Sequence, residues 1–465
     1  MTTEGPAPGV DPINQVEQSA LPARPRPIHP SLVMRVRGRP VLLRGMRAQP
    51  TGIWRWLAIL GPGLVAGAVG NDAGGIATYS QAGAQFGYEL LWVIVLITVS
   101  LAVVQEMSAR LGAATGRGLL ELIRERFGVG WALLAVAVVF IANFGLVIGE
   151  FAGIGAATEL FGVSKYLAVP VAAVIIGFLI VRGGYGQIEK VFMVMAAVFL
   201  AYPLAAILSH PNLGQVARGA FVPHVQPDAA YLAVLVGLIG TTISPYQQVF
   251  QQSAVVEKGV ARKRYGPERW DTYVGMAFSN LVSAFIIIAA AATLHATGNT
   301  HIDTAADAAK ALQPVAGSAA MALFAVGLLG ASLMAAGVLP IATAFSVAEA
   351  FGLPKGVSLS LRRAPAFFTL FLVVLGLGAA LSLIPNLPVF QFLVGVQILN
   401  GVLLPVILVF MLLLINDGKL MGNLKNSRVY NVLGWVTTVL ISLAVGFLLL
   451  QQALGLFGVK LLGGG

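Results

Sequence analysis

The chain has 465 residues, of which 57% are hydrophobic and only 10% are charged, and its mean hydropathy is +0.86. A soluble domain carries about 25% charged residues, so this composition excludes a soluble globular protein and indicates one that lies largely within a membrane. The net charge of +10 is therefore attributed to basic residues in loops that face anionic lipid headgroups. No nucleic-acid partner is expected.

The N-terminal segment, residues 1–48, is rich in proline and arginine and contains no long apolar run. It lacks the hydrophobic segment of a cleavable signal peptide, and we expect a disordered, basic cytoplasmic tail. Residues 49–453 form the expected transmembrane domain, and residues 454–465 an extracytoplasmic C-terminal tail. The absence of cysteine excludes disulfides, thiolate metal ligands and a cysteine nucleophile.

Eleven apolar segments follow the tail, most of them long enough to cross about 30 Å of hydrocarbon as helices. They are residues 53–81, 88–109, 131–160, 165–182, 191–209, 229–256, 271–296, 318–349, 364–384, 389–415 and 432–452. With the N-terminus in the cytoplasm, 24 of the 29 Lys and Arg residues fall in cytoplasmic segments and four in segments on the other side. This asymmetry predicts a multi-pass protein of the plasma membrane with its C-terminus outside the cytoplasm.

The first apolar segment carries an acid, Asp72, at its middle, followed by Ala73, Gly74 and Gly75. A carboxylate at membrane depth is costly and marks a functional position. The two glycines favour a break in the helix, and a break leaves backbone carbonyls without helical partners. An acid beside freed carbonyls predicts a cation site.

A second interruption lies in the sixth segment, in the sequence GLIGTTISPY of residues 237–246. Pro245 removes a backbone donor and clashes with the preceding turn. If residues 53–209 and 229–415 are two inverted five-helix repeats and residues 432–452 an extra helix, the two breaks occupy matching positions. Paired breaks of this kind indicate the midplane substrate site of a secondary transporter.

The motifs of the first two segments resemble those of a known family. Gly61-Pro62-Gly63, Asp72-Ala73-Gly74-Gly75 and residues 80–88 resemble the first helix of the NRAMP metal-ion transporters, and residues 105–116 resemble the end of the second. The resemblance covers residues 53–415. It implies an all-α, LeuT-type fold and the uptake of divalent metal ions, usually coupled to protons.

Departures from the family motifs indicate which ion is carried. The family has Asp-Pro-Gly-Asn in helix 1, with the Asp and Asn as metal ligands; here Asp72 is kept, Ala73 replaces the Pro and Gly75 the Asn. In helix 6 the family has a metal-binding Met followed by Pro-His, replaced here by Ser244 and Tyr246. Losing a thioether and an amide leaves a wider, all-oxygen site, which suits Mg²⁺. This pattern resembles the NRAMP-related magnesium transporter branch.

Further polar residues are candidates for the site or for the ion's route. Gln397 matches a family glutamine that can approach the ion, and Glu150 matches the Glu of an Asp-x-x-Glu pair on the family's proton route, although Val147 replaces the Asp. Each polar candidate has an alternative interpretation as a hydrogen bond between helices. The candidate metal ligands are Asp72, Ala73, Gly75, Thr241, Ser244 and Gln397, and the candidate route residues are Glu150, Tyr246 and Asn400.

Two other acids have simpler interpretations. Glu106 precedes Arg110 by one helical turn, a spacing that favours a structural ion pair over a role in transport. Glu349 is most simply a polar residue inside the helix bundle.

The leading hypothesis is a carrier that takes up Mg²⁺, and also Mn²⁺, by alternating access. We expect no proton coupling, because neither Tyr246 nor Val147 titrates near neutral pH. The metal would be a substrate, with no cofactor and no obligatory protein partner. The alternatives are a proton-coupled carrier of Mn²⁺ or Fe²⁺, a membrane-embedded enzyme, a non-transporting scaffold, and an amino-acid carrier, which the charge of Asp72 disfavours.

Overall fold

The computed structural model describes residues 32–36, 39–43, 67, 69–183, 199, 201–226, 228–260, 262, 265–310, 317 and 320–456. The chain divides into two units, Met1–Ala58 and Ile59–Gly465. In the first unit, β1 (Leu32–Val36) and β2 (Arg39–Leu43) pair as an antiparallel hairpin. These strands were not predicted, and they lie within the segment that was expected to be a disordered tail. A lone two-stranded hairpin has little stability in water.

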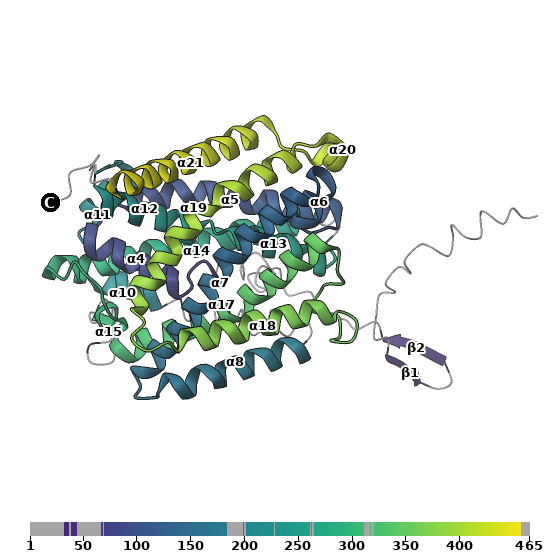
Figure 1. Cartoon of the computed structure of the whole chain (residues 1–465), viewed down its shortest axis with the longest axis horizontal. Coiled ribbons are helices and arrows are strands. Elements are labelled where there is room, and N and C mark those ends of the chain that lie inside the picture. The colour runs from purple at the N-terminus through teal and green to yellow at the C-terminus, as the bar shows by residue number, and fades with distance from the viewer. Residues whose placement is uncertain are drawn as a thin grey trace, which may run out of the picture. The chain divides into compact units, whose positions relative to one another are not determined.

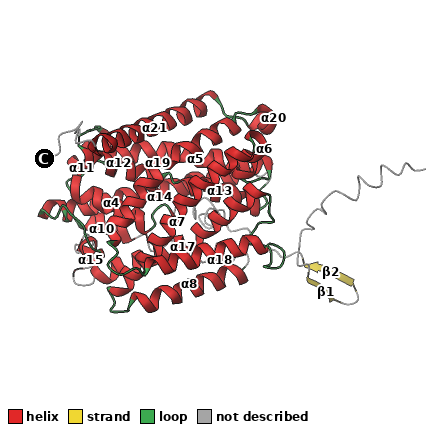
Figure 2. Ribbon diagram, viewed as in Figure 1, coloured by secondary structure: helices red, strands yellow, loops and turns green. Residues whose placement is uncertain are grey.

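Every regular element described in the second unit is a helix (Figures 1 and 2). In chain order the α-helices are α4 (Ala73–Phe86), α5 (Leu91–Thr115), α6 (Leu119–Phe127), α7 (Val129–Glu159), α8 (Lys165–Arg182), α10 (Ala201–Leu208), α11 (Leu213–Phe221), α12 (Ala229–Thr242), α13 (Pro245–Glu257), α14 (Tyr265–Thr293), α15 (Ala305–Ala309), α17 (Ala320–Phe351), α18 (Pro365–Ser382), α19 (Val389–Ile415), α20 (Gly418–Met421) and α21 (Arg428–Leu456). Figure 1 shows α21 along one edge of the helix bundle, and α8 beside α18 along the opposite edge.

Nine segments of the described residues are long and apolar enough to cross a membrane, with α12 and α13 counted as one span. They correspond to nine of the eleven predicted segments, the second to fourth and the sixth to eleventh. Of the other two, the first segment is described only at residue 67 and from residue 69 onward. The fifth is described only at residue 199 and from residue 201.

The break in the sixth segment falls where the sequence predicts it. The helix α12 ends at Thr242, Ser244 adopts an extended conformation, and α13 starts at Pro245. A proline fits the first helical position because its missing N–H has no partner there in any case. The side-chain oxygen of Gln247 accepts a hydrogen bond from the Ser244 N–H over 3.3 Å, which stabilises the new helix start.

The first segment is also interrupted, at Asp72. This residue is extended and caps α4, and its carboxylate accepts the Gly75 N–H at 2.6 Å. A carboxylate at an N-cap satisfies a backbone donor that has no helical partner. The turn before it is closed by hydrogen bonds from Gly70 to Gly67 and from Asp72 to Val69. The N-terminal half of this broken helix lies outside the described residues.

Glycines let each helix that carries a break pack closely against a neighbouring helix. A Cβ on Gly240 of α12 would lie 2.0 Å from the Gln397 carbonyl oxygen of α19, and a Cβ on Gly83 of α4 would lie 2.4 Å from the Ile287 carbonyl oxygen of α14. Backbones can approach to this distance only where no side chain intervenes. The breaks are therefore held in a tightly packed centre.

One end of the bundle, here called the basic end, is formed by the loops that follow α5, α13, α17 and α19. Ion pairs and hydrogen bonds join these loops, including Arg126 with Asp417, Lys355 with Glu121, and Ser358 with Glu257. At the same end Glu349, which is 1% exposed, accepts hydrogen bonds from the Leu120 N–H at the start of α6 and from the Ser253 hydroxyl of α13. Glu349 thus lies inside the bundle, as predicted.

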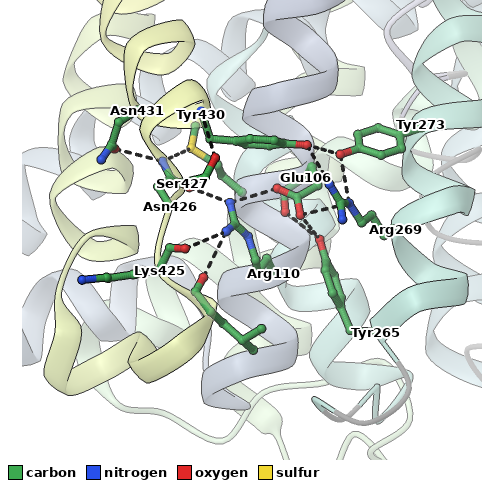
Figure 3. Close-up of polar contacts among 12 residues, drawn as sticks. Glu106, Arg110, Tyr265, Arg269, Tyr273, Lys425, Asn426, Ser427, Tyr430 and Asn431 are labelled. Atoms are coloured by element: carbon green, nitrogen blue, oxygen red, sulfur yellow. Dashed lines mark hydrogen bonds and ion pairs between the residues drawn. The ribbon is translucent and has the colours of Figure 1, made fainter.

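A buried ionic cluster, here called the Glu106 cluster, joins α5 to α14 near the basic end (Figure 3). Glu106 is 2% exposed and pairs with Arg110 at 3.0 Å and with Arg269 at 3.6 Å. It also accepts a hydrogen bond from the Tyr265 hydroxyl at 2.7 Å. The pairing of Glu106 with Arg110 confirms the structural interpretation made from their spacing.

Arg110 extends this cluster to the loop before α21. Its guanidinium donates to the carbonyl oxygens of Leu424 and Lys425 and to the side-chain oxygen of Asn426, and lies over the ring of Tyr430 (Figure 3). A planar fork of donors suits several acceptors at once. The last helix is therefore fixed to α5 and α14 through one side chain.

Candidate metal-binding site

The candidate site is centred on Asp72, which is 2% exposed. One carboxylate oxygen, Oδ1, accepts two hydrogen bonds, from the Gly75 N–H at 2.6 Å and from the side-chain amide of Gln397 at 3.0 Å. The first partner is on its own helix and the second is on α19. The chain break in the first segment and the middle of α19 therefore meet at this carboxylate.

Glu150 of α7 lies at the same break. Its Oε2 accepts the Ala73 N–H at 3.2 Å, while its Oε1 is buried and has no hydrogen-bond partner among the residues that the structure describes. Ala73 is the residue next to Asp72, so the two carboxyl groups are neighbours across the start of α4. No local sequence rule predicts this contact, because Ala73 and Glu150 are 77 positions apart.

Thr241 completes one side of the site from the end of α12. A Cβ built on Gly75 would lie 3.0 Å from the Thr241 hydroxyl oxygen and 3.3 Å from the Asp72 Oδ1. The hydroxyl is buried and has no hydrogen-bond partner in the described part of the chain. The second break thus presents an unpaired oxygen to the residues of the first.

Two amides of α19 add further oxygens. Gln397 Oε1 and Asn400 Oδ1 are both buried and unpartnered, although the amide nitrogen of each residue donates, Gln397 to Asp72 and Asn400 to the Val396 carbonyl. Leaving a buried acceptor unpaired costs about 1–3 kcal/mol. The contact with Asp72 links Gln397 to the centre, whereas the bond made by Asn400 stays within its own helix.

Ser244 and Tyr246 make different contacts. The Ser244 hydroxyl donates to the Gly240 carbonyl at 2.6 Å, within the last turn of α12. The Tyr246 hydroxyl donates to the Val69 carbonyl at 3.2 Å and so ties the start of α13 to the turn before Asp72. Tyr246 therefore braces one break against the other. Ala73 is the first residue of α4, and its described hydrogen bond is the N–H bond to Glu150.

Sequence reasoning missed Asn71. Its amide donates to the carbonyl and hydroxyl oxygens of Ser279, and its oxygen accepts from the Ser283 hydroxyl, both on α14. These bonds fix the residue next to Asp72 against a neighbouring helix. The position of this polar residue directly before Asp72 was the feature of the sequence that could have identified it.

The electrostatics of the centre are those of a cation site. The donors to Asp72 and Glu150 are backbone N–H groups and one amide, and among the residues the structure describes neither carboxyl forms an ion pair with Lys, Arg or His. Buried negative charges without a counter-ion are strongly unfavourable. No cluster of three or more His, Cys, Asp or Glu side chains occurs in the described part of the chain, so carboxyl, hydroxyl and amide oxygens are what the centre offers.

Two interrupted helices whose breaks meet at buried acids, inside a bundle of membrane-spanning helices, define a transporter of cations. The chain matches the family model described as natural resistance-associated macrophage protein-like over residues 63–451. The protein therefore belongs to the Nramp family of divalent-metal transporters, and the resemblance found in its motifs is confirmed.

Solved structures agree on the fold. The manganese transporter of Eremococcus coleocola, in complex with an aromatic bis-isothiourea compound, matches with a TM-score of 0.67 at 22% identity, covering 85% of this chain and 87% of that one. A nucleobase–cation symporter in a closed conformation matches with a TM-score of 0.51 at 15% identity, covering 84% and 92%. A Na⁺-coupled sialic acid symporter matches with a TM-score of 0.52 at 12% identity, covering 82% and 88%.

The fold is thus LeuT-type, as the sequence predicts. Family membership makes the chain a multi-pass membrane transporter of divalent metals and excludes the hypothesis of a membrane-embedded enzyme. The metal is the transported substrate in this family and not a cofactor.

Proposed function

We propose that this transporter takes up Mg²⁺, and also Mn²⁺, by alternating access and without coupling to protons. The observation that carries the proposal is the oxygen-only set of side chains around Asp72. Glu150, Thr241 and Gln397 each have a buried, unpaired oxygen there. Mg²⁺ prefers oxygen ligands and keeps several of its waters, so a few such oxygens suit it.

The two replaced family ligands support a hard-ion site. Gly75 offers no side chain, and Ser244 brings a hydroxyl where the family has a thioether. Soft sulfur ligands favour transition metals, and their loss removes that preference. These features support assignment to the NRAMP-related magnesium transporter branch, with Asp72, Gly75, Thr241, Ser244, Gln397 and Ala73 as the proposed ion-contacting residues.

The contacts of the replaced proton-route residues support uncoupled transport. Tyr246 uses its hydroxyl to bind the Val69 carbonyl, and Val147 packs so closely on α18 that a Cβ on Gly378 would lie 2.4 Å from it. Both positions are thus occupied by structural contacts. Proton transfer needs titratable groups within hydrogen-bond reach of one another, directly or through one water.

We also propose the orientation predicted from the basic residues. The basic end would face the cytoplasm of a plasma-membrane protein, with residues 1–48 inside and residues 454–465 outside. The loops of that end carry ten Lys and Arg residues among the described positions, which supports this orientation through the positive-inside rule. Thiol labelling of single cysteines added at residues 3 and 464 of intact cells would test it.

One observation favours a second candidate, proton-coupled transport of Mn²⁺ or Fe²⁺. Glu150 matches the glutamate on the family's proton route. One of its carboxyl oxygens accepts the Ala73 N–H beside the central carboxylate, and the other accepts no hydrogen bond from the described residues. Such a carboxyl could accept a proton as the ion leaves.

The deciding experiment uses purified protein in liposomes that contain a pH-sensitive dye and a metal-sensitive dye, with an outward K⁺ gradient and valinomycin. We expect Mg²⁺ and Mn²⁺ added outside to enter without acidification of the lumen. Proton influx that requires the metal would contradict the proposal and support the second candidate.

Variants test the site in the same liposomes. Asp72→Asn should keep the cap on α4, because asparagine caps helices as well as aspartate does, but should abolish metal entry. The control is Glu159→Gln, which removes an exposed acid from the end of α7 and should leave flux unchanged. Flux at the wild-type rate in Asp72→Asn would show that the central site is wrongly assigned.

A further inference from the structure

Four glutamines in α13, just after the second break, lie inside the bundle. Gln247, Gln248, Gln251 and Gln252 are each 0–1% exposed. A fifth, Gln105 of α5, is 0% exposed and contacts the first of them. Glutamine is rarely fully buried in proteins, so five together need an explanation.

The partners of these amides fix which atom is the oxygen. The nitrogen of Gln248 donates to the Ser244 carbonyl at 3.0 Å, and the nitrogen of Gln252 donates to the Arg117 carbonyl at 2.8 Å. A carbonyl oxygen can only accept, so neither amide can be turned over. The Oε1 atoms of both residues are buried and accept no hydrogen bond from any residue that the structure describes.

The same reasoning applies to Gln251. Its nitrogen donates to the Thr272 hydroxyl at 3.1 Å, and that hydroxyl already donates to the Glu268 carbonyl. The hydroxyl hydrogen is therefore used, and the contact needs the amide nitrogen. Gln251 Oε1 is unpartnered as well.

Gln105 is fixed through its neighbour. Gln247 Oε1 accepts the Ser244 N–H, so the 3.3 Å contact between the two glutamines must be donated by the Gln105 nitrogen. This leaves Gln105 Oε1 buried and unpaired. Four unpaired amide oxygens, on Gln105, Gln248, Gln251 and Gln252, are here called the glutamine strip.

An unpaired buried acceptor destabilises a fold, and leucine at each position would avoid that cost. The strip is therefore best explained if its oxygens gain partners in another state of the transport cycle. Those partners must be hydrogen-bond donors, and they must be mobile, because the surrounding side chains leave the oxygens unsatisfied.

The strip runs from the candidate site to the basic end. Gln248 bonds to Ser244 at the break, and Gln252 bonds to Arg117 in the loop after α5. In this structure α5 packs against α13 along this stretch: the Ser108 hydroxyl donates to the Gln248 backbone carbonyl at 2.5 Å, and a Cβ on Gly112 would lie 2.8 Å from the Gln252 backbone carbonyl oxygen. The helix α13 spans about 20 Å at 1.5 Å per residue, enough to lead out of the bundle centre.

We propose that the glutamine strip is the path by which a hydrated divalent cation passes between the site and the basic end when α5 and α13 separate. This rests on the proposed function. Water bound to a cation points its hydrogens outward, and amide oxygens accept them. Because amides are neutral, they hold the hydrated ion weakly and let it go, as a conduction path requires. Carboxylates at these positions would retain it.

The first test measures flux and binding separately. The double variant Gln248→Leu, Gln252→Leu should lower Mg²⁺ flux into liposomes by roughly 30-fold, since two hydrogen bonds to the passing hydrated ion are lost. Mg²⁺ binding to the purified protein should stay at the wild-type affinity. The matched control is Gln451→Leu on α21, a glutamine that also has an unpaired oxygen but lies off the strip.

The outcomes separate the two proposals. A wild-type protein that moves no Mg²⁺ would overturn the proposed function and the strip with it. Active wild type together with an equally active double variant would overturn the strip alone. A double variant that loses binding as well as flux would also overturn it, since the residues would then belong to the site.

The second test needs no transport assay and uses the absence of cysteine from the chain. Gln248→Cys and Gln252→Cys should react with a charged, membrane-impermeant methanethiosulfonate reagent applied from the basic end. Val249→Cys, which replaces a residue of the same helix that is 0% exposed, should not react. No reaction at either glutamine position, or equal reaction at all three positions, would overturn the proposal.

Discussion

At Gly75 and Ser244, two departures from the family motif have different structural consequences. Gly75 is required by crowding, because a Cβ there would lie 2.8 Å from the Gly70 carbonyl oxygen, which is backbone and cannot swing aside. The Ser244 side chain has no such backbone crowding, and its hydroxyl donates to the Gly240 carbonyl. Gly75 therefore determines the shape of the turn, whereas Ser244 can be replaced by a residue that offers a different metal ligand.

Selectivity should follow the second position. Ser244→Met restores a soft thioether, and we expect it to raise the affinity for Cd²⁺ relative to Mg²⁺ by about tenfold. Ser244→Ala is the matched control, since it removes the hydroxyl without adding sulfur and should leave the ratio unchanged. Competition binding measures the ratio. A wild-type protein that already binds Cd²⁺ far more tightly than Mg²⁺ would contradict the hard-ion site. Gly75→Asn should instead lower the transport of every ion.

The helix α5 makes polar contacts with two other parts of the chain near the basic end. Its residue Glu106 joins α14 through Tyr265 and Arg269, while Arg110 reaches the loop before α21. The arrangement in Figure 3 thus fastens three helices at one point. Its charged groups lie beside Gln105, so separating α5 from its neighbours has to disturb them.

Breaking this cluster should destabilise the protein. Glu106→Gln leaves Arg110 buried without its carboxylate, and removal of one partner from a buried ion pair costs about 3–5 kcal/mol. We expect the melting temperature in detergent to fall by several degrees. Glu125→Gln removes the partly exposed partner of Arg117. It should lower the free energy of unfolding by less than about 1 kcal/mol, and the melting temperature should therefore change little. Equal effects of the two variants would argue against a structural role for the cluster.

The same elements show what sequence can predict. The break at Pro245 and the pairing of Glu106 with Arg110 depend on residues close in the chain, so local rules predict both. The contacts of Glu150 with Ala73 and of Gln397 with Asp72 join residues 77 and 325 positions apart. Such contacts depend on how helices pack, and only the family resemblance pointed to Gln397. The glutamines of α13 are evident in the sequence. Which of their oxygens are unpaired can be decided only in the structure, from the hydrogen-bond partner of each amide nitrogen.

For the whole molecule, uncoupled transport of a divalent ion makes the membrane potential the driving force. One charge crossing 100 mV corresponds to about 2.3 kcal/mol, and a divalent ion to about twice that. The accumulation at equilibrium is then set by the potential alone.

The predicted accumulation is large enough to measure. At about 60 mV, negative inside, free Mg²⁺ in the liposome lumen should reach roughly 100-fold the outside level, because about 2.8 kcal/mol corresponds to two factors of ten. A pH gradient of one unit, imposed at the same potential, should not change the ratio. Accumulation that follows the pH gradient would indicate coupling to protons.

The bond from Gln397 to Asp72 gives the proposed site an internal competitor for its ion. While that amide nitrogen occupies the carboxylate, an arriving cation has to displace it, and rotation of the same amide by half a turn offers the cation the free oxygen instead. Binding is thus an exchange of partners. A hydrogen bond to a charged group is worth about 1.5–3 kcal/mol, so the exchange weakens affinity by roughly 10- to 100-fold. It also gives the carboxylate a partner as soon as the ion departs, which speeds release and lets the empty carrier return.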